Sequence, residues 1–190
     1  TVEELRLVMA LAKVHTVDGL IAGLFMDNKV QVKESPEKED EMMNLAANDA
    51  IHKRTYAKHS GVVAELDSLM TANHIAYFVF KGTAAASHYS KPYRRTMGDV
   101  DFYVPKYMFD KAIDVLTNQW NVKVDSGESE KHMSFSYKNV SFELHHRVET
   151  FGSCKHQRLY DQWINEGLAP SGGCEVAGGS ARRLSAVEGI

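Results

Sequence analysis

Apolar residues in the first 74 positions recur with the three-to-four-residue spacing of helices. Residues 2–27 show this period, which predicts that they are helical. A second helix is expected over about 36–73, because Ser35 suits an N-cap, Pro36 suits the first helical position, and the acidic residues that follow suit the positive end of the helix dipole. We leave open whether this helix breaks near Ser60-Gly61. Its expected buried stripe consists of Met42, Met43, Leu45, Ala46, Ala50, Val62, Val63, Leu66, Leu69 and Met70.

From residue 75 onward the pattern changes to short apolar runs that alternate with helical segments. Runs rich in aromatic and β-branched residues are typical of strands. This order predicts an α+β fold, a small mixed β-sheet with helices packed on it and an N-terminal helical region before it. We expect strands at 75–80, 99–104, 121–125, 132–138 and 140–146, the last two forming a hairpin with Asn139 near its turn, and helices at 82–90, 106–120 and 160–168.

These patterns divide the chain into an N-terminal helical region (1–74), a mixed core (75–150) and a weakly patterned C-terminal segment (151–190). Near the end of the chain, the segment 184–188 has the form of a hydrophobic staple, an N-cap and a capping-box glutamate. We therefore expect further helices beyond Ile190.

The overall composition suits an ordinary globular domain, with 190 residues and a hydrophobic fraction of 44%. A formal net charge of −3 gives no basic excess for binding duplex nucleic acid. No apolar run is long enough to span a membrane, and the first residues do not resemble a signal peptide. Cys154 and Cys174 lack metal-finger spacing and are expected to be reduced thiols, so we expect a cytoplasmic protein.

The stretch 98–101, Gly-Asp-Val-Asp, places two carboxylates at the start of an expected strand. Alternate residues of a strand share a face, so Asp99 and Asp101 are expected to project together. Two like charges repel and are costly to bury, but a cation between them changes this balance. Carboxylate oxygens suit Mg²⁺ or Mn²⁺, which in turn bind phosphate oxygens. The alternative is a pair of exposed carboxylates at a strand end.

Three neighbouring features favour a metal site that handles phosphate. Lys81-Gly82 closes one expected strand and opens a helix, where backbone N–H groups and the ammonium can hold a phosphate. Arg94-Arg95 precedes the carboxylates and can neutralise a triphosphate or pair with Asp99. Glu143 lies among apolar neighbours in the last hairpin strand and can complete a two-metal arrangement, although an edge-strand salt bridge is its alternative.

Together these motifs resemble those of the nucleotidyltransferase superfamily with the DNA polymerase beta-like fold. The resemblance is greatest to an uncharacterised bacterial branch with the pattern Lys-Gly, then Arg-x-x-Gly-Asp-hydrophobic-Asp-hydrophobic, then hydrophobic-Glu-hydrophobic-His. The matching segments are Lys81-Gly82, Arg95 to Phe102 and Phe142 to His145, and the resemblance covers about residues 75–148. Thr83 stands where the superfamily often has Ser, and the spacing from Gly82 to Asp99 is longer than in its minimal members.

The resemblance implies a transfer in which a hydroxyl attacks the α-phosphate of an NTP and pyrophosphate leaves. It implies that Asp99 and Asp101 bind Mg²⁺ or Mn²⁺, and that Glu143 binds the catalytic ion and helps to deprotonate the acceptor. The sequence does not indicate which acceptor is used. The nucleotide-binding residues expected from the resemblance or from their charge are Lys81, Gly82, Thr83, Arg94 and Arg95.

Three histidines lie near Glu143 in the sequence or across the expected hairpin. His145 shares the face of Glu143, so it can orient a carboxylate, contact the acceptor or fill a polar edge. His146 points the other way and is expected to be structural. His132 on the partner strand approaches the site only in some registers.

Other function classes stay open. One is a non-catalytic nucleotide-binding or toxin-antitoxin-like module of the same fold. A glycosyltransferase that binds a metal and a nucleotide-sugar through Asp-x-Asp ranks lower, because the preceding residues look helical. A zinc hydrolase that uses His145 and His146 ranks lowest, because adjacent residues of a strand point to opposite faces.

Overall fold

The computed structural model describes residues 1–125, 132–166, 173–176 and 179–182. The chain forms two compact units. The first contains residues 1–58 and 88–97, and the second contains residues 59–87 and 98–190. The division falls between Lys58 and His59, inside the long helix α3 (Lys38–Ala72), so this helix contributes to both units. The expected α+β fold class is confirmed.

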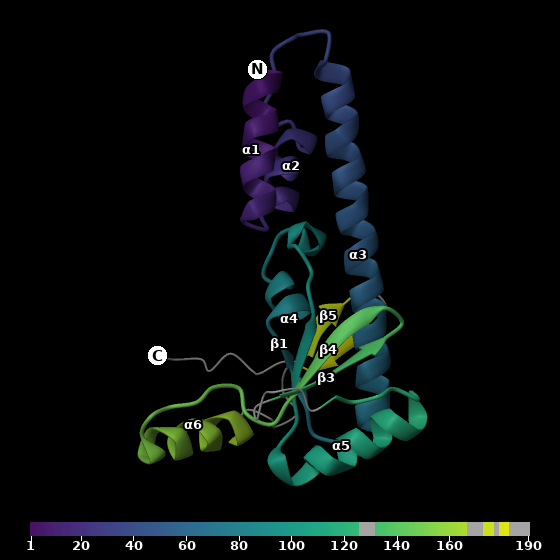
Figure 1. The fold of residues 1–190 in the computed structure, drawn as a ribbon, viewed down its shortest axis with the longest axis vertical. Helices are drawn as coiled ribbons and strands as arrows, with labels where there is room; N and C mark the ends of the chain where they lie inside the picture. The colour runs from purple at the N-terminus through teal and green to yellow at the C-terminus, as the bar shows by residue number, and fades with distance from the viewer. Residues whose placement is uncertain (126–131, 167–172, 177–178, 183–190) are drawn as a thin grey trace. The chain divides into compact units, whose positions relative to one another are not determined.

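The first unit is helical (Figure 1). Two helices, α1 (Val2–Val14) and α2 (Asp18–Met26), fill most of the range that the sequence predicts to be helical. Thr16, with a φ of 55°, interrupts the chain in a left-handed conformation that an α-helix cannot contain. The unit also holds the first part of α3 and the 3₁₀ turn η1 (Pro92–Arg94). Its apolar core consists of Val2, Leu5, Ala22, Val32 and Leu45.

Helix α3 runs without a break through Ser60 and Gly61. Its expected buried stripe is confirmed in the C-terminal half, where Val62, Val63, Leu66, Leu69 and Met70 are buried. In the N-terminal half the stripe is largely wrong, since Met43, Ala46 and Ala50 are exposed and only Leu45 is fully buried. The small core of the first unit covers one narrow side of the helix there, whereas a whole sheet packs on its C-terminal half.

The second unit is built on a four-stranded mixed sheet with the strand order β1-β2-β4-β3. β2 pairs antiparallel with β1 and parallel with β4, and β3 pairs antiparallel with β4. Parallel pairing of β2 and β4 requires a crossover, which α5 (Lys106–Gln119) and β3 supply. The strands are β1 (Phe78–Phe80), β2 (Val100–Tyr103), β3 (His132–Tyr137) and β4 (Val140–His145).

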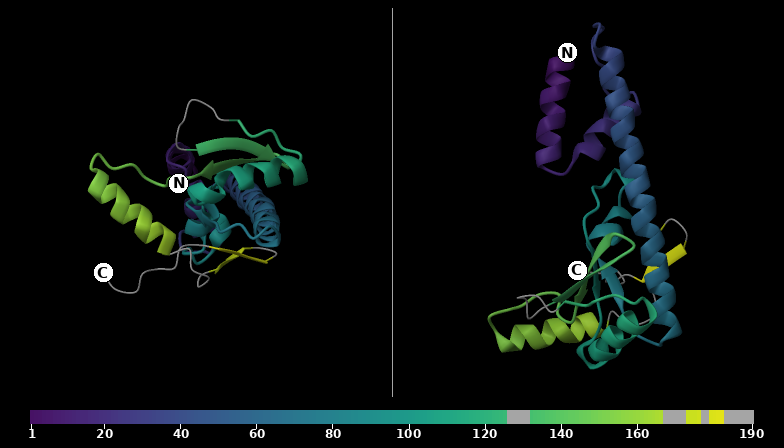
Figure 2. Two further views of the ribbon diagram at one scale, coloured as in Figure 1. Left: turned by 90° about the horizontal axis from the view of Figure 1, so that it is seen from below. Right: turned by 45° about the vertical axis from the view of Figure 1, so that its right-hand side comes forward.

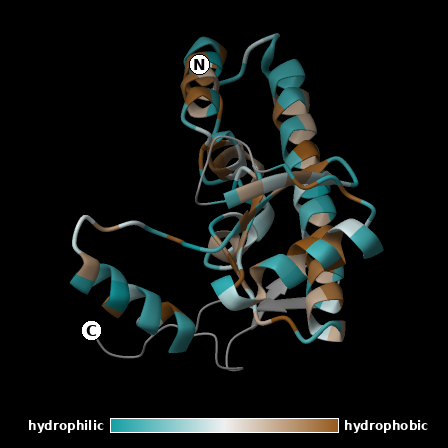
Figure 3. Cartoon of the chain, turned by 60° about the horizontal axis from the view of Figure 1, so that its bottom comes forward, coloured by the Kyte–Doolittle hydropathy of each residue, from teal (hydrophilic) through white to brown (hydrophobic). Residues whose placement is uncertain are grey.

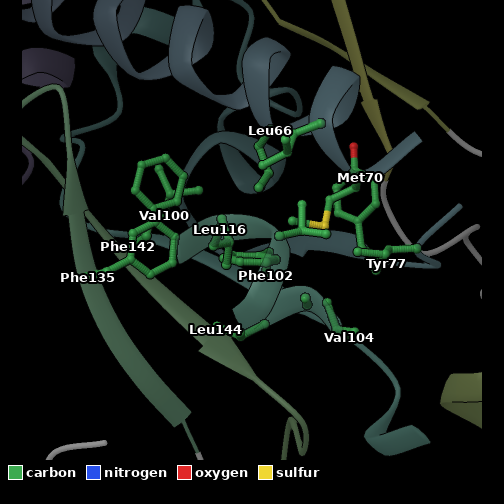
Figure 4. Close-up of a cluster of buried hydrophobic side chains, with 14 of the residues drawn as sticks. Leu66, Met70, Tyr77, Val100, Phe102, Val104, Leu116, Phe135, Phe142 and Leu144 are labelled. Atoms are coloured by element: carbon green, nitrogen blue, oxygen red, sulfur yellow. The ribbon is translucent and has the colours of Figure 1, made fainter. Parts of the chain in front are cut away.

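One face of this sheet is apolar and forms the main core. Phe102, Phe142 and Leu144 project from it and are fully buried. They pack against the C-terminal half of α3 and against Leu116 of α5 (Figure 4). Aromatic rings stabilise this layer, because Phe135 and Phe142 stack with ring centroids 5.0 Å apart.

The opposite face carries polar groups at one end and a smaller apolar cluster at the other. Phe78, Tyr103 and Ile164 form this cluster, and Ile164 comes from α6 (Cys154–Glu166). Helix α6 therefore packs through Ile164 on the face opposite to α3 and α5, and the rest of the helix extends outward from the sheet (Figure 2). The helix is largely hydrophilic with isolated apolar positions, as expected for a helix that packs through a narrow stripe (Figure 3). It begins at Cys154, six positions before the predicted helix of 160–168, whose last two residues lie outside the described residues.

Several other boundaries differ from the prediction. Residues 121–125 do not form the expected strand. Within the described part of the chain, their only β-type pairing is an isolated bridge from Asp125 to Ser134. Helix α4 (Gly82–Ala86) is shorter than the predicted 82–90. A two-stranded sheet of β5 (Gly173–Val176) and β6 (Gly179–Arg182) was not expected from the sequence. Among the described helices, none is long and apolar enough to cross a membrane.

Candidate functional site

Asp101 and Glu143 lie side by side on neighbouring strands. The parallel register of β2 and β4 places Asp101 directly opposite Glu143. Asp99 sits just before β2 and is exposed, whereas Asp101 is almost completely buried and Glu143 is half-buried. One carboxylate oxygen from each residue lies within 4.8 Å of the other two. The structure therefore brings together the three carboxylates that the sequence singles out.

Two cationic or protonatable groups contact the buried carboxylate of Asp101. Nζ of Lys81 lies 2.7 Å from Oδ1 of Asp101, and Nε2 of His145 lies 3.1 Å from the same oxygen. Burial raises the pKa of Asp101, but the hydrogen bonds from His145 and Lys81 outweigh it and leave this pKa below its usual value. Burial lowers the pKa of Lys81, but its hydrogen bond to Asp101 and the charge of that carboxylate raise it above the usual value overall. Asp101 is thus held ionised at neutral pH.

The turn that carries Lys81 has an unusual backbone. Lys81 adopts a φ of 53° and a ψ of −137°, a combination that favours glycine and costs an L-residue energy. Gly82 follows, and a Cβ there would lie 3.1 Å from the carbonyl oxygen of Asp99, so the turn packs closely against the strand entry. This approach brings the Lys81 ammonium to the carboxylates.

Thr83 lies in the first turn of α4 and is buried. Its Oγ1 is inaccessible and has no hydrogen-bond partner within the described part of the chain. A buried hydroxyl without a protein partner is uncommon in folded proteins. The position is compatible with the expected phosphate contact at Gly82 and Thr83.

Arg94 and Arg95 belong to the first unit, not to the unit that holds the three carboxylates. Arg94 is buried and donates from Nη1 and Nη2 to Asp27, at 2.6 Å and 2.9 Å. Two glycines of α2 make room for it, because a Cβ at Gly23 would lie 2.4 Å from its guanidinium carbon and one at Gly19 would lie 2.5 Å from its carbonyl oxygen. Arg95 donates to the carbonyl of Thr96 at 3.0 Å. These contacts give Arg94 a structural function within the first unit.

The three histidines take distinct positions. His145 is buried and contacts both Asp101 and Glu143. These contacts are compatible with the expectation that His145 orients a carboxylate. His146 points to the opposite face, where its ring lies 5.0 Å from that of Phe109, and burial lowers its pKa. His132 pairs with His145 across the hairpin, and its Nε2 lies 3.6 Å from Oε1 of Glu143.

The position of His132 could have been predicted from the turn of the hairpin. Lys138 and Asn139 both have positive φ, of 50° and 56°, as in a two-residue type I′ turn. Such a turn pairs Tyr137 with Val140, and counting outward pairs His132 with His145. By contrast, no local signal in the sequence indicates that Asp27 is the partner of Arg94.

A small mixed sheet with helices on both faces and clustered carboxylates on neighbouring strands fits the core of a nucleotidyltransferase. The chain matches the family described as uncharacterised nucleotidyltransferase over residues 2–187, and it belongs to this family. No curated protein matches the chain. The family makes the protein a transferase that acts on a nucleotide substrate.

Proposed function

We propose that the protein transfers a nucleoside monophosphate group from an NTP to a hydroxyl acceptor, with release of pyrophosphate, and that it does so in the cytoplasm. The observation that carries this proposal is the pairing of Asp101 with Glu143, with Asp99 close enough to share an ion with both. Three carboxylates offer hard oxygen ligands, which fit Mg²⁺ or Mn²⁺. Such an ion, when bound, would polarise the phosphate and favour deprotonation of the attacking hydroxyl.

The residues of the chain have separate tasks in this proposal. Asp99 and Asp101 hold the cation, and Glu143 contributes a ligand and accepts the proton of the acceptor hydroxyl. The acceptor oxygen forms a bond to the α-phosphorus, the bond from that phosphorus to the bridging oxygen breaks, and pyrophosphate departs with the electron pair. The buried position of Asp101 limits its motion, so one ligand is fixed before substrate binds.

Lys81, Gly82 and Thr83 are the proposed triphosphate contacts. The Lys81 ammonium is already beside the carboxylates and more than half of its side chain is exposed, so it can turn to a phosphate when a cation binds Asp101. The close approach of Gly82 to Asp99 keeps this turn at the edge of the site. Arg94 and Arg95 remain expected nucleotide contacts from their charge, and the guanidinium of Arg94 is paired with Asp27.

The proposal is tested by measuring binding and transfer separately. Calorimetric titration with a non-hydrolysable NTP analogue and Mg²⁺ reports binding, and α-labelled NTPs offered with sugars, RNA ends and proteins report transfer. Asp101→Asn and Glu143→Gln are expected to lower transfer at least about 100-fold, as expected when an electrostatic element of a catalytic site is removed. Asp110→Asn is the matched control, because Asp110 is an exposed carboxylate on α5.

The outcomes discriminate between an enzyme and a binding module. Transfer of label by the wild type and by Asp110→Asn, but not by the two site variants, supports the proposal. Tight Mg²⁺-dependent NTP binding without transfer to any acceptor class favours the non-catalytic nucleotide-binding module. NTP binding and turnover unchanged by both site variants would contradict the proposed site.

A further inference from the structure

Two histidines lie beside Glu143 on the same face of the sheet. His132 of β3 is the register partner of His145 of β4, and Glu143 precedes His145 by two positions. The two imidazole rings lie 5.1 Å apart. Nε2 of His145 lies 3.3 Å from Oε2 of Glu143, and Nε2 of His132 lies 3.6 Å from Oε1. Each oxygen of the carboxylate therefore has one ring nitrogen next to it.

Each of the two nitrogen-to-oxygen separations is of the size found between neighbouring ligands of a tetrahedral ion, and the two run to different oxygens of Glu143. Zn²⁺ binds nitrogen and carboxylate oxygen at about 2.1 Å, so two of its ligands lie about 3.4 Å apart. One ligand atom from each of His132, Glu143 and His145 lies within 4.8 Å of the other two. His145 is almost buried, whereas the side chains of His132 and Glu143 are 29% and 26% exposed. Three protein ligands with a solvent-facing side leave room for water as a fourth ligand.

The donor atoms distinguish this cluster from the three carboxylates. Asp99, Asp101 and Glu143 offer only oxygen, which suits Mg²⁺ and Mn²⁺. The histidine cluster offers two imidazole nitrogens and one oxygen, a set that suits Zn²⁺ and similar transition metals. Such a mixed site binds both Co²⁺ and Zn²⁺ more tightly than it binds Mn²⁺. Two sites with different ion preferences thus share Glu143.

We propose that His132, Glu143 and His145 bind a zinc-type transition-metal ion, at a site that shares Glu143 with the Mg²⁺ or Mn²⁺ site but takes its other two ligands from histidines. The proposal concerns ion binding alone and stands independently of nucleotidyl transfer. It also differs from a site built on His145 and His146, since His146 lies on the other face of the sheet. The cross-strand pair, not the adjacent pair, provides the two imidazoles.

The test uses Co²⁺ and Zn²⁺ with the whole chain free of any histidine tag. Co²⁺ in a site with imidazole ligands and low coordination number gives an intense visible absorption band, and Zn²⁺ affinity is measured by competition with a chromophoric chelator. The wild type is expected to bind one equivalent with this band. His132→Ala is expected to abolish the band and to weaken Zn²⁺ binding by about 100-fold or more. Even loss of a residue that only hydrogen-bonds to a metal ligand lowers metal affinity by about 10–100-fold, and His132 is itself a proposed ligand.

Two control variants distinguish this site from metal binding elsewhere on the chain. His156→Ala removes an exposed histidine on α6 and is expected to leave Zn²⁺ binding unchanged. Asp99→Asn alters only the carboxylate set and is expected to keep the Co²⁺ band. If His132→Ala proves poorly folded by circular dichroism, His132→Gln provides the same test with a polar side chain of similar size. Absence of binding in the wild type, loss of the band in Asp99→Asn, or unchanged Zn²⁺ affinity in a folded His132 variant would overturn the proposal.

Discussion

The ammonium of Lys81 lies 2.7 Å from Oδ1 of Asp101, so a cation already accompanies the most buried carboxylate of the candidate site. A divalent ion that binds Asp101 must share this carboxylate with Lys81 or displace it. This ion pair therefore links the stability of the ion-free protein to metal binding. The effect of Lys81 on both can be measured without knowing the acceptor substrate.

We expect Lys81→Met to destabilise the ion-free protein and to increase its response to Mg²⁺. Removal of the ammonium leaves Asp101 buried with one fewer partner, which costs about 1 kcal/mol because the lysine side chain is itself more than half exposed. Mg²⁺ replaces the lost positive charge, so it should stabilise Lys81→Met more than the wild type. Urea unfolding with and without Mg²⁺ measures both effects. Lys123→Met, at an exposed position, is the control, and equal Mg²⁺ effects in the wild type and Lys81→Met would argue against displacement.

The backbone of Lys81 gives a second prediction. With a φ of 53° and a ψ of −137°, this residue holds a conformation that glycine adopts freely. Lys81→Ala loses the ion pair and keeps the strain, whereas Lys81→Gly loses both. We expect Lys81→Gly to be more stable than Lys81→Ala by about 1 kcal/mol, since strain of this kind costs about 1–3 kcal/mol and glycine loses part of this gain through its flexible unfolded state. Urea denaturation gives the free energy of unfolding of each variant. If Lys81→Gly is less stable than Lys81→Ala, the backbone of residue 81 is not strained.

The sequence predicts the carboxylates well because their signal is local. Asp99 and Asp101 are separated by one residue at the start of an apolar strand, and that spacing alone places them on one face. The pairing of Asp101 with Glu143 is different, because the parallel register of strands about 40 residues apart is decided by packing of the whole sheet. The turn at Lys138 and Asn139 fixes the hairpin register locally, so the His132 partner could have been predicted.

The partner of Arg94 shows the limit of local reasoning. Arg94 lies five residues before Asp99, and nothing in the intervening sequence indicates that its guanidinium pairs with Asp27. A pair of residues 67 positions apart leaves no local pattern. The spacing of Gly19 and Gly23 by one helical turn was an available signal for close packing on α2, but not for its partner. The interruption at Thr16 was also hidden, since apolar residues continue at helical spacing on both sides.

Glycine substitutions test the Arg94 packing with a matched control in the same chain. A Cβ at Gly23 would lie 2.4 Å from Cζ of Arg94, so Gly23→Ala must displace a buried, ion-paired guanidinium. We expect a loss of about 2 kcal/mol in the free energy of unfolding, as for overpacked interiors. Gly61→Ala places the same methyl group in open space on α3 and is expected to stabilise by about 0.5–1 kcal/mol through helix propensity.

Urea unfolding measures both glycine variants. Similar effects of the two substitutions, in either direction, would contradict the close packing of Gly23 on Arg94. Gly19→Ala provides a further comparison, because its Cβ would lie 2.5 Å from the carbonyl oxygen of Arg94 and would push on the backbone instead of the guanidinium.

Acid should weaken the first unit through Asp27. The two hydrogen bonds from Arg94 and the one from Lys91 hold the pKa of Asp27 well below its usual value. An Asp in the unfolded chain titrates at about 3.9. The unfolded state therefore takes up this proton first as pH falls, so the stabilisation by Asp27 is complete above that pKa and decreases as pH drops toward the folded-state pKa.

The measurement compares wild type with Asp27→Asn in urea at a series of pH values. The difference in their free energies of unfolding should be constant from about pH 7 to pH 5 and should decrease toward pH 3. Asp110→Asn, which alters an exposed carboxylate on α5, should show no such pH-dependent difference. A difference between wild type and Asp27→Asn that stays constant or grows on acidification would mean that Arg94 and Lys91 do not hold Asp27 ionised, and the buried arginine would then need another counter-charge.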